Sequence, residues 1–195
     1  IGGMQLQYAT MPHGGGQTLF GRLRQSGSVL LSVYALLTVM CFIALWVAGM
    51  PMFDALCHAL STVSTGGFST RDGSIGAFNS PSIEFIVAVF MLLAAMNLTL
   101  HWSAVNGRWR HYRLDPETGY LWLVLMIVIL TVTLSFMAGK NDFSVTSLRW
   151  ALFSSVSFTT NTGFWTGDLA GTPMLPAFLL LGALMVGGAS GSSSG

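Results

Sequence analysis

The sequence predicts an all-α integral membrane protein made of two tandem units, each a span, a short re-entrant helix and a second span. Three observations support this fold class. The composition is 52% hydrophobic and only 8% charged, whereas soluble domains carry about 25% charged residues. Several apolar runs reach the length of about 20 residues that a helix needs to cross a bilayer. Two polar segments that are too short to span repeat each other in sequence.

The beginning of the chain predicts the approach to a first span. Residues 1–12 read as the end of a preceding membrane helix, and residues 13–27 are a glycine-rich segment that predicts a cytoplasmic loop. Residues 28–48 form an uninterrupted apolar run, long enough for a tilted span. Since the chain has no initiating Met and no signal peptide, and closes on a Gly/Ser run, we expect a piece of a longer polypeptide.

The first unit continues with a re-entrant segment at residues 51–72. Its helix runs for only about ten to twelve residues, which is too short to span. Pro51 suits the first turn of a helix, and Asp54 complements the helix dipole there. Residues 82–102 then predict the second span, within which we expect Asn97 to bond to another helix.

Other polar side chains near this segment have plainer interpretations. We expect His58 to serve packing within the short helix rather than to line a pore. We expect Arg71 and Asp72 to pair, either at the mouth of a pore or as an ordinary solvated salt bridge. The two cysteines, Cys41 and Cys57, have no metal-binding or redox spacing.

The second unit follows residues 103–119, a predicted cytoplasmic loop. Residues 120–138 predict its first span, and residues 142–168 its re-entrant segment. Residues 173–195 begin as an apolar helix that breaks in a Gly/Ser-rich run. Pore unit one thus covers residues 28–102.

The distribution of charge predicts the orientation. Five of the eight basic residues lie in the two loops predicted to be cytoplasmic: Arg22, Arg24, Arg108, Arg110 and Arg113. Only two of the seven acidic residues, Asp115 and Glu117, lie there. Because positively charged loops stay in the cytoplasm, both re-entrant segments enter the membrane from the outer face.

The two re-entrant segments, LSTVSTGGFSTRD (60–72) and FTTNTGFWTGD (158–168), are related in sequence. With a one-residue gap at Gly67, the matched pairs are Thr65 with Thr162, Gly66 with Gly163 and Phe68 with Phe164. Internal repeats of membrane units often place a transport site at the interface between the repeats. The repeat therefore predicts a shared site.

Elementary chemistry explains these residue types. A short helix that dips into the membrane aims the negative end of its dipole at a cation, and an extended segment beyond it replaces the hydration shell of the ion with backbone carbonyls. Glycine permits the dihedral angles that turn successive carbonyls one way. Irregular backbone at membrane depth is tolerated only where it is buried or lines water. The segments therefore predict pore helices with re-entrant selectivity-filter loops; ordinary extracellular loops are the alternative.

The motifs HALSTVSTGGFSTRDGSIGAFNSP and NTGFWTGD, the opening IGGMQLQYA and the closing GGASGSSSG resemble the potassium uptake proteins of the Trk/Ktr/HKT superfamily, of the bacterial TrkH/TrkG type. The resemblance covers nearly the whole chain. It implies four such units in one polypeptide, of which this chain holds the second and most of the third. The implied protein is a homodimer in the bacterial cytoplasmic (inner) membrane, with a cytoplasmic nucleotide-binding regulatory subunit of the TrkA type.

The resemblance also implies functional residues. The transported K⁺ ion would be bound by backbone carbonyls of the filter residues Ser64, Thr65, Gly66, Asn161, Thr162 and Gly163. The gate would be a Gly/Ser-rich intramembrane loop below the filter, containing Gly187, Gly188 and Gly191. Ala189 and the serines at 192–194 depart from the cysteine and further glycines that the family often has in this loop. An engineered linker or a flexible tail is the alternative interpretation of this run.

Other functions stay open at this point. A non-Trk pore-loop cation channel, or a Na⁺/K⁺ transporter, would use the same carbonyl chemistry. An intramembrane sensor scaffold would need facing carboxylates or histidines at membrane depth, and the acids near a span are Glu84 and Asp168. The sequence has no nucleophile paired with a base, no metal-ligand cluster and no cofactor motif, so it does not predict an enzyme.

Overall fold

In the computed structural model of the chain, the described residues are 19–107, 115–140, 145–167, 174–184, 188–189 and 192–193. Every regular element in these ranges is a helix. The predicted end of a preceding helix at 1–12, the acid Asp168 and the predicted gate residues Gly187 and Gly191 lie outside them.

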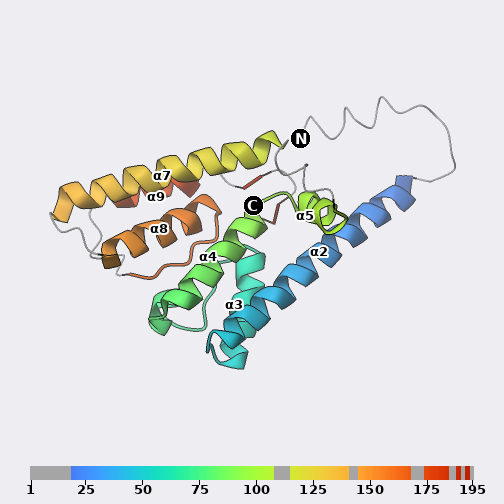
Figure 1. Cartoon of the computed structure of the whole chain (residues 1–195), viewed down its shortest axis with the longest axis horizontal. Coiled ribbons are helices and arrows are strands. Elements are labelled where there is room, and N and C mark those ends of the chain that lie inside the picture. Colours follow the sequence, from blue (N-terminus) through green and yellow to red (C-terminus); the bar gives the residue numbers. More distant parts are fainter. Residues whose placement is uncertain are drawn as a thin grey trace.

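The described helices form two groups that follow each other along the chain. The first group is α2 (Leu19–Val47), α3 (Met52–Val63), the 3₁₀ helix η1 (Ser74–Phe78), α4 (Pro81–Ala95) and α5 (Leu98–Val105). The second group is α7 (Pro116–Lys140), α8 (Val145–Thr159) and α9 (Met174–Leu184). Within each group the helices pack on one another, and α4 packs on α8 to join the groups (Figure 1).

Two of the predicted loops are shorter than the sequence indicated. α2 is helical from Leu19, so the predicted loop 13–27 is wrong for its second half. The glycines suggested a loop, but a single Gly costs a helix only about 1 kcal/mol, which the neighbouring apolar residues offset. In the predicted loop 103–119, α5 continues to Val105 and α7 already begins at Pro116, whose fixed φ suits a first helical turn.

The predicted span at 82–102 is not one helix. α4 ends at Ala95, α5 begins at Leu98, and the two axes are bent by 99°. Asn97 causes the restart, because its side-chain Oδ1 accepts a hydrogen bond from the amide of Thr99 at 2.9 Å and so caps α5. The expected bond from Asn97 to another helix is therefore replaced by a local cap.

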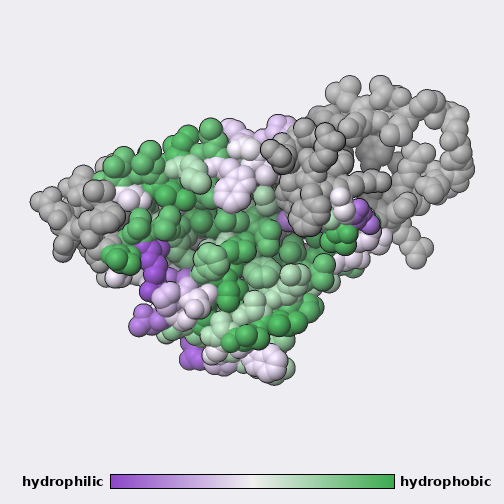
Figure 2. Space-filling model, viewed as in Figure 1, coloured by the Kyte–Doolittle hydropathy of each residue, from purple (hydrophilic) through white to green (hydrophobic). Residues whose placement is uncertain are grey.

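The apolar surface of the molecule is that of a multi-pass membrane protein. Two described stretches, Gly27–Val47 and Pro116–Ser135, are long and apolar enough to span a bilayer, and the bent pair α4–α5 would be a third. Hydrophobic residues cover most of the coloured surface in Figure 2, and hydrophilic residues gather near the beginnings of α4 and α8. Lipid is the solvent that suits such a surface.

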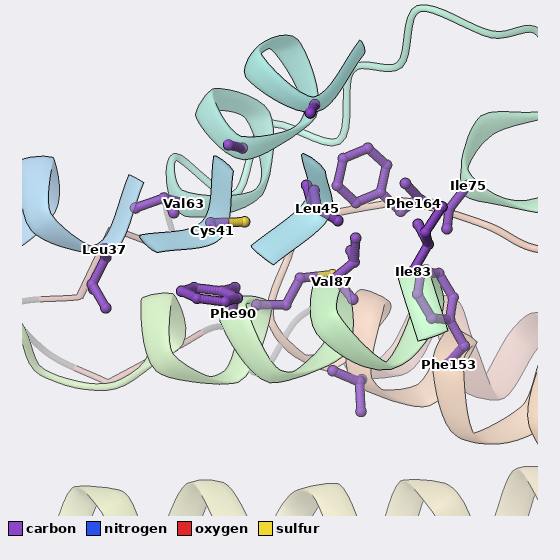
Figure 3. Packing of buried hydrophobic residues seen from close by; sticks show 14 of the residues in the cluster. Leu37, Cys41, Leu45, Val63, Ile75, Ile83, Val87, Phe90, Phe153 and Phe164 are labelled. Carbon is purple, nitrogen blue, oxygen red and sulfur yellow. The ribbon is translucent and has the colours of Figure 1, made fainter. Parts of the chain in front are cut away.

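The main core lies between α2, α3 and α4, and the second unit contributes to it. Cys41 and Leu45 of α2 face Val87 of α4, and all three residues are fully buried (Figure 3). Phe153 of α8 and Phe164, which follows α8, belong to the same cluster. The two units therefore share one core instead of merely touching, which fixes their relative position.

Candidate functional site

The polypeptide leaves the two short helices α3 and α8 through the same turn. In the first unit, backbone amides of Ser64, Thr65 and Gly66 donate to the carbonyls of Leu60, Thr62 and Ser61 at 3.1, 3.1 and 2.8 Å. In the second unit, those of Thr160, Asn161 and Thr162 donate to Val156, Phe158 and Ser157 at 3.0, 3.1 and 2.9 Å. The two turns thus correspond residue by residue, without a gap.

The backbone angles agree with this gapless register. Thr65 and Asn161 both adopt a left-handed conformation, with φ of 53° and 59°. Two residues later Gly67 and Gly163 have φ of 68° and 86°, a region that favours glycine. The sequence-based pairing of Gly66 with Gly163 is therefore wrong, and Gly67 is the counterpart of Gly163. The gap aligned the two Thr-Gly pairs by their residue types, whereas in the structure the two turns share one backbone conformation without a gap.

The two turns lie directly against each other. A Cβ atom built on Gly67 would stand 2.0 Å from the carbonyl oxygen of Thr162, so no side chain fits there. The atoms nearest to a Cβ on Gly66 would belong to the side chains of Ser64 and Phe68, at 3.2 and 3.3 Å. The close approach of the two repeats therefore depends on Gly67, a residue that sequence reasoning did not select. Its signal was the doubled glycine before Phe68.

The segment that follows the second turn is fastened to the first unit. Phe164 is fully buried, and its ring lies 5.9 Å from the ring of His58 on α3. The amide of Gly76 in η1 donates to the carbonyl of Trp165 at 3.2 Å, and the amide of Trp165 donates to the Ser74 hydroxyl at 3.3 Å. These contacts hold the second turn beside the first.

Beneath the first turn, His58 has the packing role expected of it. Its Nδ1 lies 2.7 Å from the carbonyl oxygen of Asp54, and its Nε2 lies 2.9 Å from the Ser69 hydroxyl. The ring also meets the edge of Phe78 at 5.3 Å between centroids. The imidazole therefore joins α3 to the segment that leaves the turn.

Arg71 pairs with Asp54 at 2.8 Å, so the predicted pairing of Arg71 with Asp72 is wrong. The Thr70 hydroxyl also donates to the Asp54 carboxylate, at 2.7 Å. The hydrogen bond from Thr70, followed by that from Arg71, holds the pKa of Asp54 below its ordinary value. The cluster ties the start of α3 to the end of the re-entrant segment. A pair between the adjacent residues Arg71 and Asp72 could not make this connection.

The described parts of the predicted gate loop lie at the broken end of α4. The amide of Ala189 donates to the carbonyl of Ala95 at 2.9 Å, and the amide of Ser193 donates to that of Ala94 at 3.1 Å. The hydroxyl of Thr65, which is part of the first turn, lies 3.1 Å from the carbonyl oxygen of Ser193 and 2.7 Å from that of Ser64. In Figure 1 the last described pieces of the chain lie beside this end of α4. The loop is therefore in contact with the turn.

An ion pair also joins the two units. Arg149 near the start of α8 donates from Nε and from its terminal nitrogen to both oxygens of Glu84 on α4, each at 2.6 Å. The Glu84 side chain is 4% exposed and that of Arg149 35%. The sequence showed both charges but not their pairing, because 65 residues separate them.

Comparison with known proteins decides the family. The family model for TrkH, described as a cation transport protein, matches residues 1–195. The chain belongs to the TrkH family. This confirms the resemblance found in the sequence. TrkH-family members are transport proteins and not enzymes, and the all-α membrane fold with tandem units is consistent with theirs.

Individual relatives of this TrkH-family chain agree. The Trk system potassium uptake protein TrkH of Salmonella typhimurium is 39% identical over 198 residues, covering 100% of this chain and 41% of that protein. The TrkH of Halomonas elongata is 40% identical over 197 residues, with the same coverage. A crystal structure of the potassium transporter TrkH from Vibrio parahaemolyticus matches with a TM-score of 0.85 and 34% identity, over 98% of this chain and 42% of that one. The chain thus spans about two fifths of the length of these relatives.

Proposed function

We propose that the chain supplies two of the pore-lining units of a potassium uptake protein in the bacterial cytoplasmic membrane. The observation that carries the proposal is the contact of two equivalent turns, with Gly67 against the carbonyl of Thr162. Two short helices, α3 and α8, end at these turns, so both direct the negative ends of their dipoles to the same place. The relatives named above are potassium uptake or transport proteins.

The proposed ion ligands are backbone carbonyls of the two turns. They comprise the residues named from the sequence, which are Ser64, Thr65, Gly66, Asn161, Thr162 and Gly163, together with Gly67. Carbonyl rings replace the hydration shell of a K⁺ ion. The left-handed residue and the glycine two positions later support this proposal, since this alternation turns successive peptide groups. Further units of the longer protein would complete the ring.

The proposed gate is the Gly/Ser-rich run below the turns. Three contacts support it: Ala189 with Ala95, Ser193 with Ala94, and Thr65 with Ser193. They keep the run against the broken end of α4 and next to the ion ligands. Gly188 directly precedes Ala189. We also propose a homodimer regulated by a cytoplasmic nucleotide-binding subunit of the TrkA type, as the family resemblance implies.

The test is rescue of a bacterium that lacks potassium uptake, using the full-length protein. The wild type should restore growth at low potassium. Gly67→Ala should lower K⁺ uptake at least about fivefold, because a positive φ and crowding together cost about 1–3 kcal/mol or more. The matched control is Gly119→Ala in α7, where nothing lies within 4 Å of an added Cβ; it should leave uptake unchanged.

The same assay separates the competing functions. A Na⁺/K⁺ transporter would show rescue together with Na⁺ uptake that Gly67→Ala alters in parallel. A sensor scaffold would show no ion uptake in any variant. Uptake by Gly67→Ala at the level of wild type, with Gly119→Ala equal to both, would contradict the proposed filter.

A further inference from the structure

A groove of about 430 Å³ lies between α4 and α8, where the two units pack on each other. Among the described residues that line it, Glu84 and Arg149 are charged and the others are apolar. The groove opens sideways onto the surface of the molecule, because Phe85 and Val145 on its walls are 71% and 81% exposed. In a protein that spans a bilayer, an apolar opening of this kind faces either lipid or another polypeptide.

The charged groups lie at one end of the groove. α4 and α8 both begin at this end, with Pro81 and Val145 on its walls. Glu84 and Arg149 follow within the first two turns of their helices, and hydrophilic residues gather on this part of the surface (Figure 2). Val156 lines the groove about 10 Å further along α8 than Arg149. In the predicted orientation the helices begin on the outer side, so the groove is polar toward the outer surface of the membrane and apolar toward its interior. A phospholipid has the same arrangement.

Arg149 has hydrogen-bond donors left over at the polar end. A guanidinium has five N–H donors, and the bidentate pair with Glu84 uses one on Nε and one on a terminal nitrogen. No described residue accepts from the others. The Arg149 side chain is 35% exposed, and the two bonds to Glu84 fix the plane of its guanidinium. The remaining donors are therefore held in place for a ligand rich in oxygen atoms.

The helix starts decide which charge such a ligand has. The pair of Glu84 and Arg149 is neutral as a whole, so it does not by itself select an anion. The positive ends of the α4 and α8 dipoles, however, lie at the same end of the groove. The side chain of Ser80, which precedes α4, makes no hydrogen bond that caps the helix. Helix starts of this kind bind phosphate groups, so the polar end favours an anion with several acceptor oxygens.

We propose that a phospholipid of the outer leaflet occupies this groove. One acyl chain lies along the apolar walls between α4 and α8, and the phosphodiester accepts hydrogen bonds from Arg149. A diacylglycerol has the acyl chains without the phosphate, and inorganic phosphate has the oxygens without the chains, so neither matches both ends of the groove. Because the walls belong to different units, the lipid braces the joint between them. The proposal is independent of the transported ion and of the filter.

The test uses the full-length protein in dodecyl maltoside micelles, which contain no phosphate. The probe is phosphatidylglycerol with a photoreactive diazirine in one acyl chain, and mass spectrometry locates the adducts. We expect adducts on groove residues such as Phe85, Ala88 and Leu152. Unlabelled phosphatidylglycerol should suppress them at least fivefold at a concentration where dioleoylglycerol and inorganic phosphate have little effect.

Three results of this competition would overturn the proposal. Equal suppression by dioleoylglycerol would show that acyl chains fill the groove without recognition of the phosphate. Equal suppression by inorganic phosphate would show an anion site that does not need the apolar walls. Adducts elsewhere but none in the groove would show that polypeptide, from a further unit or from a second copy, covers it. None of these measurements requires a variant that folds.

Matched variants locate the two parts of the site. Leu152→Trp fills the groove and should lower the adducts at least fivefold, whereas Leu130→Trp on α7 should leave them unchanged. Leu152 and Leu130 are 41% and 59% exposed, but Leu130 does not line the groove. Equal labelling of the two variants would contradict the proposed position of the acyl chain.

The polar end is tested by Arg149→Met combined with Glu84→Gln, which leaves no charge unpaired. This double variant should still be labelled, but phosphatidylglycerol should then compete no better than dioleoylglycerol. A preference for phosphatidylglycerol as large as that of the wild type would show that Arg149 does not bind the phosphate.

Discussion

At the scale of single residues, the re-entrant turns owe their shape to a few backbone positions. Thr65 and Asn161 accept a left-handed conformation, with φ of 53° and 59°, that costs most residues about 1 kcal/mol or more. The hydrogen bonds back to the ends of α3 and α8 offset that cost. Gly67 and Gly163 then return the chain to an extended course. Two features of the side chains matter in these turns: no side chain is present at the two glycines, and the Thr65 hydroxyl forms a hydrogen bond.

One residue-scale prediction concerns Asp54, whose carboxylate accepts from Thr70 and Arg71. Because these bonds lower its pKa below the ordinary 3.8 in the folded protein, their stabilising effect is present above that value and disappears as pH falls through the lowered pKa. In detergent, the wild type should lose thermal stability in acid over this range. Asp54→Asn should melt a few degrees lower at pH 7 and show a weaker acid dependence. Parallel pH curves for the two proteins would contradict this.

At the scale of elements, the α4–α5 break is the least ordinary feature. A helix that ends at membrane depth leaves carbonyls without donors. Here the carbonyl of Leu93 accepts from His101 at 2.8 Å, and those of Ala94 and Ala95 accept from Ser193 and Ala189. A distant segment, which contains Ala189 and Ser193, therefore supplies the donors that the end of α4 lacks. Through this segment the end of α4 is also connected to the first turn.

Thr65→Val tests this connection. The change removes the hydroxyl that contacts Ser193 and Ser64 but keeps the shape of the side chain. If the segment containing Ala189 and Ser193 is the gate, losing this contact should favour its release. K⁺ uptake should then rise about two- to tenfold, since one hydrogen bond is worth about 0.5–1.5 kcal/mol. Thr65→Ser, which keeps the hydroxyl, is the control. Uptake that falls equally in both variants would argue against a gating contact.

A second element-scale prediction concerns the pair that joins α4 to α8. Arg149→Met leaves the carboxylate of Glu84 buried without its cation, and should destabilise the protein by about 2 kcal/mol, less than the 3–5 typical of fully buried pairs. The double variant Arg149→Met with Glu84→Gln should recover part of this loss, because no charge is left unpaired. Thermal unfolding in detergent measures both. A double variant less stable than Arg149→Met would contradict the argument.

The sequence predicts elements better than it predicts joints between them. The apolar runs that became α2 and α7 are plain in the residues, and the Thr-Gly repeat pointed to the two turns. The bend at Asn97 was missed because hydropathy does not register a side chain that caps a helix. Gly67 was missed because the two segments were aligned by residue type and not by backbone conformation. The partners of Arg71 and Thr65 lie 17 and 128 residues away, beyond the reach of local patterns.

At the scale of the whole molecule, the two units are bound through a shared core, a bidentate ion pair and the contact of their turns. The apolar outer surface and the positions of the charges indicate how this body lies in a bilayer. From the rule that positive loops stay inside, we predict that the re-entrant segments enter from outside and that the end of α5 lies on the cytoplasmic side. The orientation applies to both units, because each contains a span before its short helix.

This orientation is open to direct measurement. Asp72→Cys, after the first turn, should react with a membrane-impermeant maleimide in intact, right-side-out vesicles. Asn106→Cys, at the exposed end of α5, should react only in inverted vesicles. Both residues are exposed, so the contrast reports sidedness and not burial. Labelling of the two sites from the same side would reverse or refute the orientation.

The end of α4 depends on hydrogen-bond donors from a distant segment of the chain, and this has a further consequence. If the segment carrying Ala189 and Ser193 departs, the oxygens of Ala94 and Ala95 lose these donors, and entering water would replace them. Departure and wetting would then be a single event. If this segment is the proposed gate, raising the osmotic pressure with a solute too large to enter the ion pathway should keep the pathway closed. The size of this effect would measure how many water molecules enter on opening.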